Sequence, residues 1–349
     1  MTQSKNESIN QSINQSMRQS FGALHLAVWL GVAALLLGVG GLAAGSEGWS
    51  FAFVQDWWFI SMIRAPRTLG AFLAGGLLGL AGAIAQGVFR NPLADPYLLG
   101  SASGATFAIV LTLSAGSALG LPIGMLGTDW FLRLGLVGAA FVGALGGISL
   151  TLLLARGARQ PTVLLLGGVV VGVLLGAVSN LLMLVSPEAL RGAQIFLLGT
   201  TGFLGWNSVW PLLASLVLCL PLAARFARVL DALVLGEETA ITLGIRLPAV
   251  RLLLVLLLAL ATGTAVAETG LIAFVGLVAP HLVRRTVIVT HGALLLLSAL
   301  AGGVLLLAAD VVARSVLAPQ ELPVGVLTAV FGGMYLLILL HRRSGREAI

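Results

Sequence analysis

Charged residues are scarce in this sequence. Asp, Glu, Lys and Arg make up only 9% of the 349 residues, whereas a water-soluble domain carries about 25%. Hydrophobic residues reach 58%, and the mean hydropathy is +1.06, so the composition excludes a soluble globular protein and indicates a membrane protein. A helix needs roughly 20 apolar residues to cross a bilayer, which leaves room for about ten such helices and for no sizeable extramembrane domain.

Several signatures of chemistry are absent as well. Cys219 is the single cysteine, so the chain has no internal disulfide and no thiol-based metal site. The sequence lacks a GxxxxGK[ST] phosphate loop, and ATP hydrolysis is therefore expected in other subunits. Ser101 and Ser103 stand in GSASG, which does not have the GxSxG spacing of a serine hydrolase. We expect no catalytic residue, no metal and no cofactor.

The basic residues are distributed unevenly along the chain. They outnumber the acidic ones by 19 to 13, but they do not form the basic stripe of a nucleic-acid-binding protein, so no nucleic-acid partner is expected. Lys and Arg of membrane proteins concentrate in cytoplasmic loops. With the amino terminus in the cytoplasm, 14 of them fall inside and 5 outside, which favours two cytoplasmic termini. The five outer residues are Arg64, Arg67, Arg133, Arg191 and Arg314.

Hydrophobic windows predict ten spanning helices. They fall near residues 24–44, 66–89, 98–119, 131–155, 162–185, 207–224, 248–267, 271–283, 292–312 and 324–340, with a shorter helix near 189–199. The first window is expected to be a retained helix, with a signal anchor as the alternative. Residues 1–20 are rich in Ser, Gln and Asn and are predicted to be a disordered cytoplasmic tail. Residues 21–349 are then a single transmembrane domain.

Residues 90–105, RNPLADPYLLGSASGA, interrupt the apolar pattern. Pro92 and Pro96 prevent continuation of a helix and leave backbone carbonyls unpaired. Irregular backbone is tolerated at membrane depth only where protein or a water-filled cavity shields it. The segment is therefore either a constriction of a transport pathway or a simple cytoplasmic loop.

Residues 235–248, LGEETAITLGIRLP, form a second distinctive segment between the sixth and seventh windows. Glu237 and Glu238 suit the positive end of a short helix, and Gly244 is a natural stop at its other end. A short cytoplasmic helix of this kind can insert into the groove of a partner protein. From composition alone the segment could equally be a solvated turn.

The outer arginines are the third feature. Arg64 and Arg67 stand in RAPR, and Arg314 stands in DVVARS, at the ends of different predicted helices. A guanidinium keeps its charge and binds carboxylates through paired hydrogen bonds. As exposed groups these arginines could dock an acidic protein or an anionic ligand, or they could simply anchor helices at the membrane interface.

Taken in order, these segments and two others resemble the FecCD-type permeases of ABC importers, the family that carries iron siderophores, haem and cobalamin. The resemblance extends from about Leu24 to His341. It is carried by RAPRTLGAFLAGGLLGLAGAIAQGVFRNPLADPYLLGSASGA, LGEETAITLGIRLPAVR, GLIAFVGLVAPHLVRR, AADVVARSV and ELPVGVLTAVFGG.

The resemblance implies an all-α, polytopic membrane protein with about ten transmembrane helices and the type II ABC importer permease fold. Such a subunit is not an enzyme. It would pair with a second copy of itself around a central pathway, in the lipid of a bacterial inner membrane, above two cytoplasmic ATPase subunits. A periplasmic binding protein would deliver a ferric siderophore or haem, with cobalamin as the alternative, and transport would proceed by alternating access.

The resemblance also implies residue roles. Arg64, Arg67 and Arg314 would dock acidic residues on the two lobes of the binding protein. A coupling helix near residues 235–246 would contact the ATPase through Glu237, Glu238, Thr239, Ala240, Leu243 and Gly244, with Thr239 a mild departure from the small residue of the family. The cytoplasmic gate would fall at Asn91, Pro92, Leu93, Pro161 and Thr162.

A secondary transporter and an intramembrane enzyme are the alternatives to an ABC importer permease. A secondary transporter driven by protons or sodium usually keeps ionisable residues in mid-membrane helices, whereas Glu268, His281 and Asp310 fall at the ends of predicted helices. An intramembrane enzyme needs clustered carboxylates or histidines. The four histidines are widely separated in sequence, at His25, His281, His291 and His341.

Overall fold

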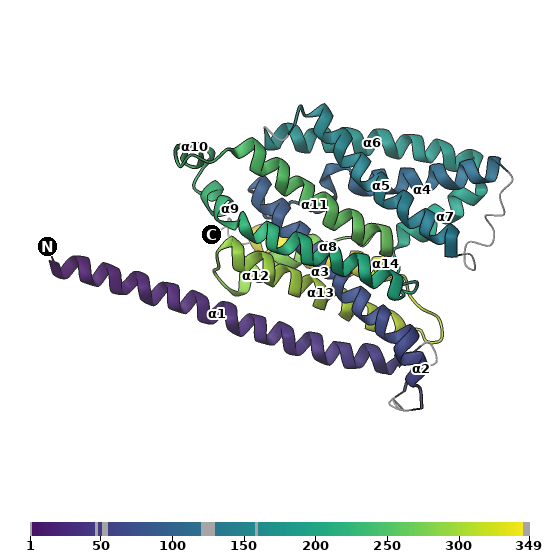
Figure 1. Ribbon diagram of the computed structural model, residues 1–349. Helices are drawn as coiled ribbons and strands as arrows, with labels where there is room; N and C mark the ends of the chain where they lie inside the picture. Colours follow the sequence, from purple (N-terminus) through teal and green to yellow (C-terminus); the bar gives the residue numbers. More distant parts are fainter. Residues whose placement is uncertain (1, 46–47, 51–54, 120–129, 158–159, 345–349) are drawn as a thin grey trace.

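The computed structural model describes residues 2–45, 48–50, 55–119, 130–157 and 160–344. Side chains are described from residue 22 onward, except those of residues 130–134, 340 and 342–344 within these ranges. The described chain is an assembly of helices with one small hairpin (Figure 1).

Eight helical segments of the described chain are long and apolar enough to cross a membrane. The helices that contain them are α1 (Thr2–Ala43), α3 (Ala65–Phe89), α4 (Ser101–Ala118), α5 (Trp130–Leu154), α6 (Pro161–Val185), α8 (Trp206–Arg225), α11 (Leu247–Thr269) and α13 (His291–Ser315). The other two predicted segments are also helical, as α12 (Val275–Thr286) and α14 (Val324–Ser344). The prediction of an all-α polytopic membrane protein is therefore confirmed.

Shorter elements connect these helices. They are α2 (Trp57–Phe59) and the π-helix η1 (Ile60–Arg64) before α3, the 3-10 helix η2 (Pro96–Leu99) before α4, α7 (Pro187–Leu198), and α9 (Ala227–Val234) with α10 (Glu237–Thr242) before α11. Strands β1 (Ala44–Gly45) and β2 (Gly48–Trp49) pair antiparallel after α1. The sequence predicted α7 and α10. It did not predict α2, η1, α9 or the hairpin, because these four elements are too short to produce a hydrophobic window.

The amino-terminal segment belongs to a long helix. The structure describes α1 from Thr2 onward, where the composition of residues 1–20 predicts a disordered tail. These residues contain neither Gly nor Pro, and nothing in their backbone chemistry stops a helix that forms in the apolar stretch that follows. Figure 1 shows the amino-terminal half of α1 projecting beyond the other helices.

Helix α3 lies at the centre of the bundle. It packs against α13, α11, α12 and α8, and 89% of the most apolar window of its spanning segment is buried. Glycines allow backbones to meet there: a Cβ added at Gly75 would lie 2.3 Å from the Gly302 carbonyl oxygen, and one at Gly82 would lie 1.7 Å from that of Gly276. Lipid tails are as apolar as the helices, so such close contacts are what holds the helices together.

The bundle has two polar ends. Figure 1 places both chain termini and α10 toward one end, and α2 at the opposite end. Ion pairs join distant segments at each end: Arg67 meets Glu321 at the α2 end, and Arg90 meets Glu237 at the α10 end. The predicted docking arginines and the predicted coupling helix therefore occupy opposite ends of the molecule.

Candidate functional site

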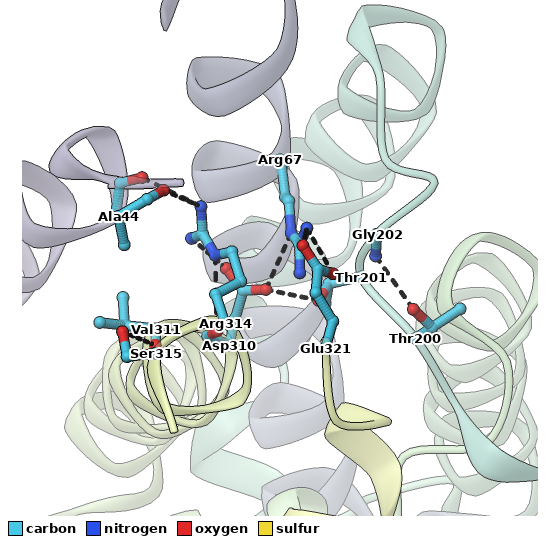
Figure 2. A network of polar contacts seen from close by, with 11 residues as sticks. Ala44, Arg67, Thr200, Thr201, Gly202, Asp310, Val311, Arg314, Ser315 and Glu321 are labelled. Atoms are coloured by element: carbon cyan, nitrogen blue, oxygen red, sulfur yellow. Dashed lines mark hydrogen bonds and ion pairs between the residues drawn. The ribbon is translucent and has the colours of Figure 1, made fainter. Parts of the chain in front are cut away.

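A buried carboxylate organises the end of the bundle that carries the arginines. Asp310 in α13 is 0% exposed. Its Oδ1 accepts hydrogen bonds from Arg67 Nε at 3.0 Å and from Thr201 Oγ1 at 2.6 Å, and its Oδ2 pairs with Arg314 Nη2 one helical turn away. Figure 2 shows the two guanidinium groups converging on this one side chain. Ion pairs of this kind are the usual form in which charges persist within membrane helices.

Arg314 is almost completely buried. The residue is only 2% exposed, and its Nη1 donates to the backbone oxygens of Gly41 at 3.0 Å and Ala44 at 3.2 Å. The sequence-based expectation of an exposed side chain is therefore wrong for Arg314. It ties α13 to the end of α1 and to β1, a contact between segments about 270 residues apart in sequence that composition could not reveal.

Arg67 and Arg64 lie nearer to the surface. Arg67 is 8% exposed, which also corrects the expectation of an exposed group, and its Nη1 pairs with Glu321 at 2.9 Å. Arg64 donates from Nη1 to the Leu42 carbonyl at 3.1 Å, and its Nη2 lies 3.9 Å from Asp56 Oδ2. Because Arg64 and Arg67 are three residues apart, the end of η1 and the start of α3 present them on the same face.

A cavity of about 510 Å³ opens beside these groups. All three predicted docking arginines line it, together with the carboxylates Asp56 and Glu321. The structure thus brings Arg64, Arg67 and Arg314 to one cavity, with acidic partners already in place, and their role in docking remains a prediction. Sequence reasoning missed Asp310 and Glu321 as members of this cluster, although the spacing of Asp310 and Arg314 at i and i+4 in an apolar helix was an available signal.

At the opposite end, α10 is a well-terminated helix of six residues. The Gly244 amide donates to the Ile241 carbonyl and the Ile245 amide to the Ala240 carbonyl, with Gly244 at φ 78°. This is the Schellman arrangement, in which a left-handed glycine ends a helix. Both the short helix and its glycine stop agree with the sequence prediction.

The two faces of α10 differ in chemistry. Ala240 is fully buried against the bundle, and Glu237 is half-buried in ion pairs with Arg90 and Arg251. Glu238 and Thr239 are exposed. Ile241 of α10 is also exposed, as are Leu235 and Leu243 just outside the two ends of the helix, at 60% to 70%. We call these three the α10 apolar face.

The predicted gate residues lie in two separate connections. The α3 helix ends at Arg90 in a left-handed conformation, and the Asn91 side chain accepts a hydrogen bond from the Leu93 amide at 2.9 Å. Asn91, Pro92 and Leu93 are exposed. Pro161 begins α6 and is followed by an exposed Thr162.

The close approach of α6 to the α3–α4 connection lies two turns further on. A Cβ at Gly168 would meet the Leu98 carbonyl oxygen at 2.0 Å. The gate assignment therefore remains a prediction.

Among the described residues, no cluster of three or more His, Cys, Asp or Glu side chains could hold a metal ion.

Comparison with known proteins identifies the family. The model of the FecCD transport family matches residues 26–342. This chain belongs to that family.

Individual relatives agree with this assignment. This FecCD protein is 37% identical to the hemin transport system permease protein of Yersinia pestis, over 94% of this chain and 99% of the relative. It is 40% identical to the vitamin B12 import system permease protein of Pectobacterium atrosepticum, over 91% of this chain and 93% of the relative. Among solved structures, one described as the inward-facing conformation of an ABC transporter of metal-chelate type has a TM-score of 0.80 and 28% identity, over 90% of this chain and 98% of that chain.

These comparisons place the arginine cluster and α10 in a transport subunit. The protein is a multi-pass permease of an ABC transporter and is not itself an enzyme. The energy of transport must therefore reach the chain from an ATPase partner, and the two polar ends of the bundle are the places where partners have access.

Proposed function

We propose that this permease imports a bulky iron chelate, haem or a ferric siderophore, from the periplasm of a bacterium across the inner membrane. The likeness to a hemin permease and to a transporter of metal-chelate type supports this substrate class. Cobalamin is the second candidate, supported by the likeness to a vitamin B12 permease. We also propose a homodimer around a shared pathway, following the family resemblance.

The observation that carries the proposal is the α10 apolar face. Ile241 in α10, Leu235 two residues before the helix and Leu243 directly after it are exposed, at the end of the bundle that also holds both termini (Figure 1). Cover by a partner protein would explain why these apolar side chains are exposed in the single chain. Apolar side chains on and beside a short helix are suited to a hydrophobic groove of such a partner. We propose that two cytoplasmic ATPase subunits bind here, through Glu238, Thr239, Leu243 and their neighbours.

The same arrangement supports a proposed orientation in the membrane. Both termini and α10 would face the cytoplasm, and the cavity of Arg64, Arg67 and Arg314 would face the periplasm. This assignment agrees with the excess of basic residues on the cytoplasmic side. The binding protein would dock at the cavity, with Arg64 and Arg67 meeting its carboxylates and the buried Arg314 holding the cavity wall in place. Charge pairing of this kind sets docking register and association rate more than affinity.

Transport itself would proceed by alternating access. Closure of the ATPase subunits on ATP would displace α10, and the two permease copies would rock to expose the pathway to one side and then to the other. Asn91, Pro92, Leu93, Pro161 and Thr162 would form the cytoplasmic gate. The chain itself makes and breaks no covalent bond.

Replacement of one residue in the α10 apolar face tests the ATPase contact. Ile241→Asp places a charge on the surface that we expect to be covered, so co-purification of the permease with its cognate ATPase should fall at least severalfold. Leu317→Asp is the matched control, because Leu317 is a similarly exposed apolar residue, at 52%, close to the opposite end of α13. Unchanged co-purification of Ile241→Asp would refute the assignment of α10.

Substrate choice requires a separate experiment. Cells that lack their own uptake systems would receive the permease, its ATPase and its binding protein, with haem, a ferric hydroxamate or cobalamin as the tested nutrient. Growth on haem or on the ferric hydroxamate supports the first proposal, and growth on cobalamin alone supports the second.

A further inference from the structure

One carboxylate joins three helices at the α10 end of the bundle. Glu237, the first residue of α10, accepts hydrogen bonds at Oε1 from Arg90 Nη2 at 3.3 Å and from Arg251 Nη2 at 3.0 Å. Arg90 is the residue that ends α3, and Arg251 belongs to α11. The Arg251 side chain is only 2% exposed, whereas Glu237 and Arg90 are partly exposed. We call these three residues the Glu237 clamp.

The backbone alone holds α10 weakly. Gly236 precedes the helix at φ 116°, and Gly244 follows it at φ 78°. Both joints are therefore glycines, which rotate more freely than other residues. A Cβ placed at Gly244 would meet nothing within 4 Å, so neighbouring atoms do not restrict that joint. A helix of six residues also has little stability of its own, and its orientation must come from side-chain contacts.

The Glu237 clamp supplies side-chain contacts that link α10 to the end of α3 and to α11. Helix α10 packs on α9 and α11, and the pair Glu237–Arg90 connects it to the end of α3 as well. Asn91 follows Arg90 directly and opens the turn that includes Leu93. The pair Glu237–Arg251 is shielded from water on the arginine side, where an ion pair is stronger and less screened by salt than at an open surface.

We propose that the Glu237 clamp fixes α10 rigidly to the end of α3 and to α11, so that a displacement of α10 moves the turn of residues 91–93 directly. Arg90 and Arg251 are thereby positioning residues for coupling, roles that the sequence did not indicate. This inference rests on the proposed function of α10 as the ATPase contact. It adds the route by which the contact reaches the pathway.

Distance measurements between spin labels test the clamp without knowledge of the substrate. Cys219 is the single cysteine and is buried, so Cys219→Ser gives a background into which Leu93→Cys and Thr242→Cys can be introduced. The labelled permease is measured in its complete complex with the ATPase, in lipid, without nucleotide and with ATP plus vanadate. We expect the same narrow distance distribution in both states.

The decisive variant is the double substitution Glu237→Gln with Arg251→Met. Glu237→Gln alone leaves a buried guanidinium without this carboxylate and can impair folding, whereas loss of both charges is tolerated far better. We expect the double variant to keep the melting temperature of the parent, and its complex with the ATPase is isolated before the distances are measured. Its distance distribution should broaden and shift with nucleotide. Arg246→Met, an exposed arginine at the start of α11, is the control and should behave as the parent.

Two results would overturn the clamp. One is a distance that changes with nucleotide in the parent protein, since α10 and the turn would then not move together. The other is a double variant as rigid as the parent. Neither result removes the proposed function, which fails instead if Ile241→Asp leaves ATPase binding unchanged.

Discussion

At the scale of single residues, the outer cluster depends on Asp310. Its carboxylate is fully buried and meets two guanidinium groups and a threonine hydroxyl. Arg67 also has Glu321 as a partner, but Glu321 is about a third exposed. The two acidic residues therefore differ in environment although they share a partner, and their substitutions should differ in cost.

Asp310→Asn should destabilise the protein by about 3–5 kcal/mol, because it leaves buried arginine charge without compensation. Glu321→Gln removes a partly exposed ion pair and should cost about 0–1 kcal/mol. Thermal unfolding of the purified permease in detergent, followed by tryptophan fluorescence, measures both. Equal melting temperatures for the two variants would contradict the central place of Asp310 in the network.

Asp95 gives a pH-dependent prediction. It lies in the α3–α4 connection, where its Oδ1 accepts a hydrogen bond from the Tyr97 amide at 2.8 Å, and burial raises the pKa of its carboxyl from 3.8 to about 6. Between these values the folded state binds more protons than the unfolded state, so the free energy of unfolding falls as pH rises. Above pH 6 the Asp95 carboxyl is ionised in the folded state, and the full cost of burying its charge lowers the free energy of unfolding.

Asp95→Asn removes this penalty and can still accept the Tyr97 hydrogen bond. The variant should be more stable than the parent at pH 7, by up to about 3 kcal/mol. The advantage should shrink toward zero as the pH falls below about 4. Melting temperatures at pH 4, 5.5 and 7 provide the measurement, and an advantage that grew on acidification would have the wrong sign.

At the scale of elements, the crossings of α3 with α12 and α13 depend on small residues. The α3 backbone lies against the Gly276 and Gly302 carbonyl groups, and added Cβ atoms at Gly82 and Gly75 would overlap with them. The backbone atoms of Gly276 and Gly302 cannot move aside for an added methyl group as a flexible side chain could. The same contacts explain why a sequence so rich in glycine forms long helices instead of loops.

Gly82→Ala should therefore destabilise the bundle by about 1–3 kcal/mol, since the methyl group forces α3 and α12 apart. Gly31→Ala in α1 is the control, because a Cβ there meets nothing within 4 Å. Its effect should be neutral or slightly stabilising, as alanine favours helix more than glycine does. Equal loss of melting temperature in both variants would show that the crossing tolerates a methyl group.

At the scale of the whole molecule, the spanning helices could be predicted because each is encoded by one continuous apolar run. The short helix α10 and its stop at Gly244 could also be predicted, because acidic residues and glycine mark helix ends locally. The outer network could not: Arg314 reaches Ala44, and Arg67 reaches Asp310, across more than 240 residues. Exposure of those arginines was therefore misjudged.

The central claim is that transport through this chain is powered by ATP through a partner at α10. The most direct test is uptake of haem, presented by the binding protein, into vesicles that contain the permease and its ATPase. We predict uptake that requires ATP, is abolished by Ile241→Asp and is not supported by a proton or sodium gradient in the absence of ATP. Uptake driven equally well by an ion gradient without ATP would contradict the account.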